Sequence, residues 1–404
     1  AHEEEFWQSF RDVVSNMTLK ASYSLTADRG PASVSNSKAI INSYNTWRPF
    51  TSVKESGLSL SSVENSELTY EKKHELNIGA EIGFIDNRIN IEADWYTRNN
   101  FDLIGLIYTK GTGGQLAKFA NVASMKSSGV EFTVSTRNIK TKDFSWNTDF
   151  IFSHTKNEVT DLQSNASVMD MISGNGFAME GYPVRALFSM DFQGLNENGY
   201  PTFINEKGQL TVSDINFQEQ LKKDHLVYEG PTDPTMTGSL GNIFRYKGFT
   251  LNAFITYSFG NVIRLDPVFH NVYSDLDAMP REFINRWTTG GDEKVTNVPV
   301  IADKRANQQD PYLSYAYNAY NYSTERIAKG DFIRMKELSL SYNFPKKMIS
   351  RLKVNDLSLK IQATNLFLIY SDKKLNGQDP EFFNTGGVAS PVPRQFTLTL
   401  RLGI

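Results

Sequence analysis

The sequence predicts an all-β protein, the wall of a transmembrane antiparallel β-barrel, from three observations. The last stretch, 394–404, alternates apolar and polar side chains, which lie on opposite faces of an extended strand. Similar segments recur at 249–259 and 357–364. The connections between such segments alternate between short and long. Alternating strands of about ten residues, with short turns on one side and long loops on the other, are typical of bacterial outer-membrane barrels.

The N-terminal half supplies five expected strands. The first, 17–25, and the second, 76–84, place an apolar side chain at every second position. Residues 85–87 form a tight turn into the third strand, 89–95. A fourth strand, 130–134, and a fifth, 144–152, are joined by the short connection 139–143.

The C-terminal half supplies five more. The sixth, 240–246, turns through Lys247 and Gly248 into the seventh, 249–259. The eighth, 338–344, ends at Pro345, because proline has no backbone N–H to donate to a neighbouring strand. The ninth and tenth, 357–363 and 394–404, complete the set.

Long connections are expected on the external side, at 28–70, 100–126, 155–235, 260–331 and 371–393. Short connections fall at 85–88, 139–143, 247–248 and 346–356, and these face the periplasm. The strand before 155–235 runs outward and the strand after it runs inward, so this stretch adds zero or two wall strands. We therefore expect the apolar segment 185–195 to form an external hairpin, together with 201–203.

Composition excludes several classes of protein. The 404 residues contain no cysteine, so disulfides, cysteine-ligated zinc and thiol nucleophiles are ruled out. The net charge of −3 argues against a nucleic-acid partner. No apolar run approaches the roughly 18 residues of a membrane-spanning helix. Loops of roughly 70 to 80 residues are out of proportion to a ten-stranded barrel, so we expect the ten strands to be part of a larger wall in a longer polypeptide.

Several motifs, in order along the chain, resemble the SusC/RagA-like TonB-dependent outer-membrane transporters. They are the segments 121–131, 180–183, 246–249, 257–260, 285–287, 330–336, 363–367, 379–381 and 393–397. The resemblance implies a 22-stranded plugged barrel, of which residues 1–404 form the C-terminal part, without the plug and the N-terminal strands. One departure is the chain end at Ile404, where such barrels commonly carry an aromatic residue.

The resemblance also implies a function. Such transporters import an oligomeric nutrient, a glycan or a peptide, with a SusD-like surface lipoprotein over the external loops, and TonB acts through the plug. The expected surroundings are the lipid bilayer, lipopolysaccharide and the remainder of the same barrel. An alternative is a barrel that has lost transport and serves as a scaffold in a larger outer-membrane complex. The choice between glycan and peptide, and the oligomeric state, stay open.

The residues give no support for catalysis. The five histidines lack metal-ligand spacing, and Gly111–Gly114 lacks the Lys-Ser/Thr that follows the glycines of a phosphate-binding loop. We expect no catalytic residue, cofactor or metal.

Aromatic residues in the long connections are the candidates for contact with a ligand or partner. Tyrosine combines a flat apolar face with a hydroxyl group, which suits sugar rings, peptides and protein interfaces. The alternatives are that these side chains pack within their own loops or form an aromatic girdle at the membrane surface. The candidates are Tyr312, Tyr315, Tyr317, Tyr320, Tyr322, Trp47 and Arg48. Trp95 and Trp146 lie in the outward register and are interpreted as membrane anchors.

Overall fold

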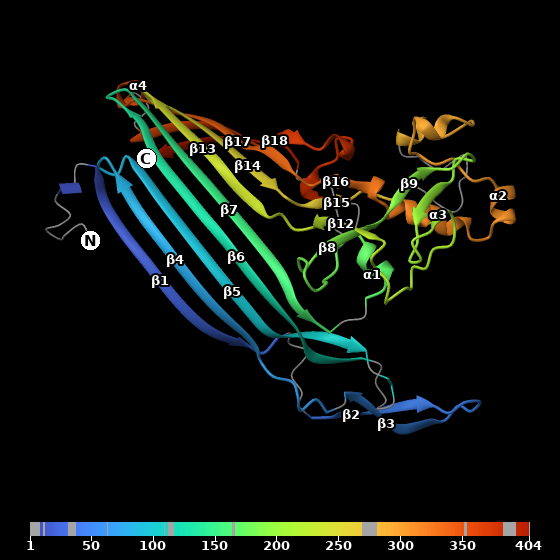
Figure 1. Cartoon of the computed structure of the whole chain (residues 1–404). Coiled ribbons are helices and arrows are strands. Elements are labelled where there is room, and N and C mark those ends of the chain that lie inside the picture. The colour runs from blue at the N-terminus through green and yellow to red at the C-terminus, as the bar shows by residue number, and fades with distance from the viewer. Residues whose placement is uncertain are drawn as a thin grey trace.

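The ten expected wall strands are all present in one curved antiparallel sheet (Figure 1). The computed structural model describes residues 9–10, 13–30, 38–62, 64–108, 110–111, 117–163, 166–268, 281–350, 354–382 and 393–403. In sheet order the strands are β1 (Val14–Asp28), β4 (Glu71–Phe84), β5 (Ile89–Tyr108), β6 (Ala117–Lys140), β7 (Phe144–Leu162), β13 (Met236–Tyr246), β14 (Phe249–Phe259), β17 (Phe332–Asn343), β18 (Asp356–Ser371) and β19 (Gln395–Gly403). Each wall strand pairs with the next one along the chain.

The strand register separates an apolar face from a polar face. Leu340 lies opposite Leu251 and Ile361, and Ile361 lies opposite Leu398. Leu398 is 69% exposed, as expected for a surface that contacts lipid. On the other face, Lys20 forms an ion pair with Glu81, and Lys360 lies 3.6 Å from Glu337. The alternation expected from the sequence is confirmed.

Polar side chains on the second face also bond one another across strands. The Ser135 hydroxyl donates to Asp149 at 2.7 Å, and the Asn252 amide donates to Glu337 at 3.2 Å. These bonds satisfy polar groups on a face that is wet in large barrels.

The expectation of a long loop at 100–126 is wrong. β5 continues to Tyr108 and β6 begins at Ala117, and the two strands remain paired through Ile107 and Lys118. Beyond the membrane both faces of a strand meet water, so the apolar–polar alternation that marks a wall strand is lost there. The short connections lie where they were expected, at 85–88, 141–143, 247–248 and 344–355.

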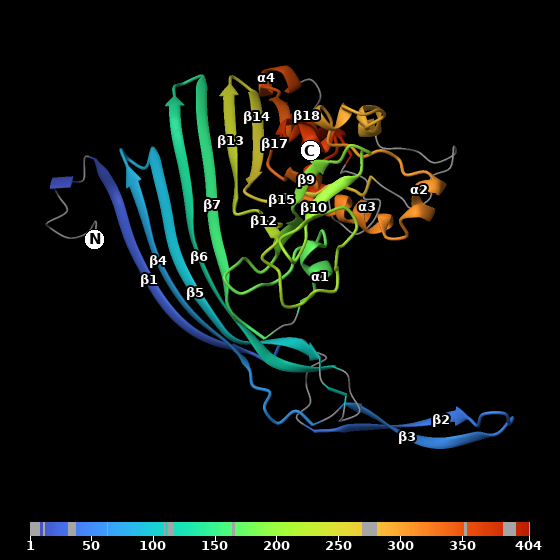
Figure 2. The same cartoon turned by 45° about the vertical axis from the view of Figure 1, so that its right-hand side comes forward.

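The connection 29–70 contains a separate hairpin, β2 (Ile40–Trp47) and β3 (Lys54–Ser62), which projects away from the wall (Figure 2). The segment 185–195 lies outside the wall, as predicted. It forms β8 (Ala186–Met190) and β9 (Phe192–Leu195), and β9 pairs with β10 (Pro201–Ile204). β8 pairs instead with β12 (Leu226–Pro231).

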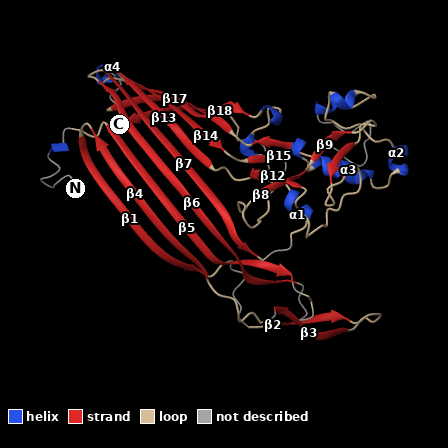
Figure 3. Cartoon of the chain, in the orientation of Figure 1, coloured by secondary structure: helices blue, strands red, loops and turns tan. Residues whose placement is uncertain are grey.

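Most helices lie in the described parts of 166–235 and 260–331, which we call the external domain (Figure 3). Besides β8–β10 and β12, its elements are α1 (Val168–Ile172), β11 (Leu210–Thr211), β15 (Val262–Arg264), η2 (Arg281–Asn285), η3 (Asp292–Lys294), α2 (Lys304–Gln309), α3 (Leu313–Asn321), η4 (Thr324–Arg326) and β16 (Ile327–Lys329). The largest core cluster joins Val168, Met190, Phe203, Phe283 and Tyr320.

Other short helices in the described parts of the chain lie outside the external domain. α4 (Lys346–Ile349) follows β17 on the short-turn side, and η6 (Lys373–Leu375) and η7 (Pro380–Phe382) follow β18. Within the described ranges, no helix has the length and apolar character needed to cross a membrane.

Candidate functional site

The external domain is attached to the wall at the end of β7. β13 begins at Met236, opposite His154, so the last residues of β7 lack a wall neighbour on that side. The segment 180–183 fills this place, because the Val159 amide donates to the Tyr182 carbonyl and the Gly181 amide donates to the Val159 carbonyl, both at 2.9 Å. Gly181 has φ +83°, a conformation that favours glycine.

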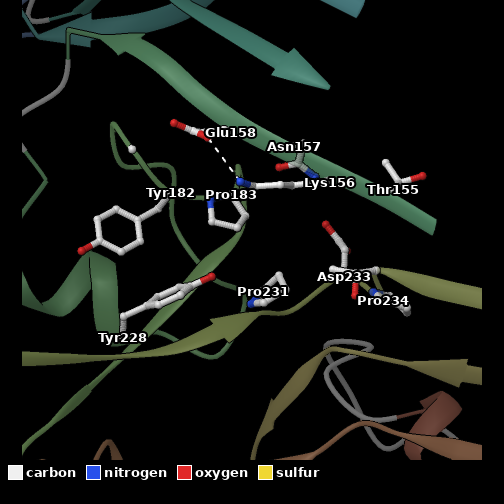
Figure 4. A pocket seen from close by; sticks show the side chains of 12 residues that line it. Thr155, Lys156, Asn157, Glu158, Tyr182, Pro183, Tyr228, Pro231, Asp233 and Pro234 are labelled. Carbon is white, nitrogen blue, oxygen red and sulfur yellow. Dashed lines mark ion pairs between the residues drawn. The ribbon is translucent and has the colours of Figure 1, made fainter. Parts of the chain in front are cut away.

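A pocket of about 280 Å³ lies at this attachment (Figure 4). β7 forms one wall, and the segment 180–183 and the end of β12 form the others. Its lining residues are Thr155, Lys156, Asn157, Glu158, Gly181, Tyr182, Pro183, Tyr228, Pro231, Asp233, Pro234 and Thr235.

The pocket combines aromatic surface with charges of both signs. The rings of Tyr182 and Tyr228 meet edge to face with centroids 4.9 Å apart, and burial raises the pKa of the Tyr228 hydroxyl. The Lys156 ammonium lies 3.8 Å from the Glu158 carboxylate, and Arg185 lies 2.7 Å from Asp233. Such a surface suits one sugar ring or one peptide residue of a longer ligand, since pockets that enclose whole small molecules span about 300–1,000 Å³.

A buried arginine fixes the elements behind the pocket. Arg264 is 5% exposed, and its guanidinium donates to the carbonyls of Ser323 at 2.8 Å, Phe188 at 2.6 Å and Ile172 at 3.2 Å. Burial lowers the pKa of Arg264 to about 10, against the opposing effect of Glu229. One side chain therefore joins the end of α1, strand β8 and the segment after α3.

The five candidate tyrosines lie in different environments. Tyr317 and Tyr320 are 1% and 3% exposed, on the inner side of α3. The Tyr317 hydroxyl donates to the Val300 carbonyl at 2.6 Å, and the Tyr320 ring packs on Phe192 with centroids 5.6 Å apart. These two side chains pack inside the external domain and are closed to an outside ligand, which corrects the expectation for them. Leu313 and Ala316 complete the same buried stripe, whose helical spacing was present in the sequence.

The other tyrosines are accessible to different degrees. Tyr312 is 61% exposed and Tyr315 is 44% exposed, with ring centroids 5.8 Å apart. Tyr322 is partly buried, with its ring 5.9 Å from the Arg264 guanidinium. Contact with a partner therefore stays a prediction for Tyr312 and Tyr315, which lie together at the surface.

Trp47 and Arg48 lie at the tip of the β2–β3 hairpin. The Lys54 ammonium sits 4.8 Å from the centre of the Trp47 ring, and Arg48 forms an ion pair of 2.6 Å with Glu55. Trp47 is 59% exposed. Figures 1 and 2 both place this hairpin apart from the external domain, so the structure does not bring these residues together with the tyrosines of α3.

The sequence did not predict the pocket residues as a group. The segment 180–183 stood out only as a motif, and nothing in the sequence indicates that Tyr228 and Asp233 reach it. Across the ranges that the structure describes, no group of three His, Asp or Glu side chains is placed to hold a metal ion.

Comparisons with known proteins identify relatives of the chain. No family model matches it. TonB-dependent receptor P3 of Formosa agariphila is 24% identical over 362 residues, which cover 84% of this chain and 34% of the relative. TonB-dependent receptor SusC of Bacteroides thetaiotaomicron is 25% identical over 357 residues, which cover 84% of this chain and 32% of the relative. The chain thus spans about a third of the length of these curated relatives.

Solved structures share the fold. The RagAB peptide transporter superposes with a TM-score of 0.76 and 22% identity, over 99% of this chain and 42% of that chain. The same importer in its open-open state superposes with a TM-score of 0.75 and 21% identity, over 97% and 40%.

The wall, its external domain and these likenesses define the class: the protein is a bacterial outer-membrane β-barrel related to the TonB-dependent receptors. Within that class the chain is similar to the SusC-like TonB-dependent receptors, and it shares its fold with the RagAB peptide transporter. Its named relatives are receptors and transporters rather than enzymes.

Proposed function

We propose that residues 1–404 form the C-terminal part of the barrel of a TonB-dependent importer. The importer takes up an oligomeric nutrient together with a SusD-like surface lipoprotein. The observation that carries the proposal is the aromatic, charged pocket at the external end of a membrane wall. The proposal is also supported by the similar proteins, which include the TonB-dependent receptor SusC and the RagAB peptide transporter.

Each part of the chain has a place in this function. The polar face of the wall lines a wet lumen, and the external domain receives the nutrient above it. Arg334 ties the last external connection to this lumen, because its buried guanidinium pairs with Asp379 and lies 2.9 Å from Glu381. The exposed ring pair of Tyr312 and Tyr315 provides an aromatic anchor for the lipoprotein.

Uptake in cells tests the proposal. A strain that lacks the gene should lose uptake of labelled glycan or peptide oligomers, and expression of the complete polypeptide should restore it. Replacing Tyr182 and Tyr228 by alanine should lower uptake at least about tenfold, because aromatic anchors typically contribute 2 kcal/mol or more. Replacement of the exposed Tyr70 by alanine is the matched control.

Partner retention separates transport from the alternative of a scaffold. Alanine at Tyr312 and Tyr315 should reduce co-purification of a surface lipoprotein while barrel abundance stays normal. If deletion of the gene leaves every uptake assay unchanged but lowers the abundance of other outer-membrane proteins, the chain serves as a scaffold and the import proposal is wrong.

A further inference from the structure

Three neighbouring connections on the short-turn side form one continuous surface. The Lys247 amide donates to the Asp143 carbonyl at 3.0 Å, which joins the turn 247–248 to the turn 141–143. The Asn343 amide donates to the Gly248 carbonyl at 2.9 Å, which joins the same turn to the connection that carries α4. Figure 2 places α4 at the end of the wall where β13 and β14 turn.

This surface carries a concentration of positive charge. Lys142, Lys247, Lys346 and Lys347 are all exposed, and we call them the turn-side lysines. Asp143 is the one acidic residue in the sequence of these three connections, and Asp356 follows as the first residue of β18. Among the described residues, none of the four ammonium groups has a carboxylate within salt-bridge distance. The charges are therefore available to an anionic partner.

Aromatic and apolar groups lie directly beside the lysines. The rings of Phe249 and Tyr342 are tilted against each other with centroids 4.4 Å apart, and the rings of Tyr342 and Phe344 meet edge to face at 4.8 Å. The Lys247 ammonium lies 5.3 Å from the centre of the Tyr246 ring, and Tyr246 is 51% exposed on the apolar face. This ammonium is thus held at the edge of the lipid-facing surface, where aromatic belts meet headgroups.

The short helix α4 repeats the combination. Lys346 and Lys347 are exposed beside Met348, which is 61% exposed, while Ile349 is buried at 2%. An exposed apolar side chain between ammonium groups suits the boundary between acyl chains and headgroups, because the lysine stems lie along the apolar layer while their charges reach water.

We propose that the turn-side lysines, together with the neighbouring rings of Phe249, Tyr342 and Phe344, bind anionic phospholipid headgroups of the periplasmic leaflet. The short turns of outer-membrane barrels face the periplasm, which places this surface at that leaflet. Clusters of lysine near a membrane attract acidic lipids, and each lysine adds to the attraction. The partner is a phosphodiester lipid with net negative charge, and zwitterionic lipids bind less well.

Competition between two lipids tests the site. The complete barrel, purified in detergent, is incubated with equal amounts of phosphatidylglycerol and phosphatidylcholine of identical acyl chains, and native mass spectrometry counts the lipids that stay bound. We expect phosphatidylglycerol to be enriched. Replacing all four turn-side lysines by glutamine should lower this enrichment about tenfold or more.

Two control variants and a salt titration complete the test. Arginine at the same four positions should keep the enrichment, and glutamine at the exposed external Lys38, Lys110, Lys222 and Lys304 should not change it. Raising the salt concentration should weaken the enrichment of phosphatidylglycerol on the unaltered protein, because salt screens charge attraction. This measurement does not depend on the folding of any variant. Equal binding of the two lipids to the unaltered protein, or full enrichment in the glutamine variant, would overturn the proposal.

Discussion

Leu398 and Thr397 are neighbours on β19 whose side chains face different solvents. Leu398 lies on the apolar face opposite Ile361, and Thr397 lies on the polar face opposite Gln362. Leu398→Arg should destabilise the folded barrel by about 2–4 kcal/mol, because a charge near the bilayer midplane loses its hydration, whereas Thr397→Arg should cost less than about 1 kcal/mol. Denaturant titration of the complete barrel in lipid vesicles measures both. Equal costs would show that the two faces are assigned wrongly.

Gly238 and Gly241 are both in β13 but have unequal space around them. The Tyr257 hydroxyl crosses over Gly238 to donate to the Ile151 carbonyl at 2.9 Å. A methyl group at 238 would meet that carbonyl and that ring, while a methyl group at 241 would be 3.5 Å from Phe254. Gly238→Ala should therefore cost about 1–3 kcal/mol.

Gly241→Ala is the matched control for this change. It should be neutral or should stabilise by up to about 1 kcal/mol, because alanine restricts the unfolded chain. The same titration compares the two variants, and a Gly238→Ala barrel as stable as the Gly241→Ala barrel would contradict the close packing of Tyr257 on the wall.

The elements of the external domain depend on Arg264. Loss of its guanidinium leaves the carbonyls of Ile172, Phe188 and Ser323 without this donor in a buried site. Arg264→Met should lower the free energy of local opening by about 3–5 kcal/mol, judged from other buried charged groups. Hydrogen exchange of α1 and β8 measures this opening.

Arg185→Met is the surface counterpart of that change. Arg185 and Asp233 are 45% and 51% exposed, so the loss of this pair should cost less than about 1 kcal/mol. If both variants open equally, the external domain is not held by Arg264, and the pocket in front of it lacks the fixed support described above.

Some elements were predictable from the sequence and others were not. Wall strands were predictable because one face meets lipid and the other meets water, which enforces alternation in segments such as β14. The outer ends of β5 and β6 were missed because both of their faces lie in water. Helix α3 was not expected within the long connection 260–331, although Leu313, Ala316, Tyr317 and Tyr320 follow helical spacing.

The pocket was not predictable for a different reason. Its residues come from β7, the segment 180–183 and the end of β12, and only the tertiary structure brings these together. Two of the five candidate tyrosines, Tyr317 and Tyr320, instead form core contacts.

At the scale of the whole molecule, the sheet has two open edges. Strand order runs from β1 to β19, and the described residues of these two strands do not pair with each other. Together with external connections too large for a small barrel, this supports the central proposal that the ten strands are consecutive strands of a larger outer-membrane wall.

Cysteine cross-linking in cells tests that claim directly, because residues 1–404 contain no native cysteine. In the complete polypeptide, cysteines at Ile361 and Leu398, which lie opposite each other, should be joined by a short bifunctional reagent in the outer-membrane fraction. Cysteines at Leu19 on β1 and Leu398 on β19 should not be joined, because further strands separate them. Efficient cross-linking of Leu19 to Leu398 would mean that the ten strands close on themselves, and the account would be contradicted.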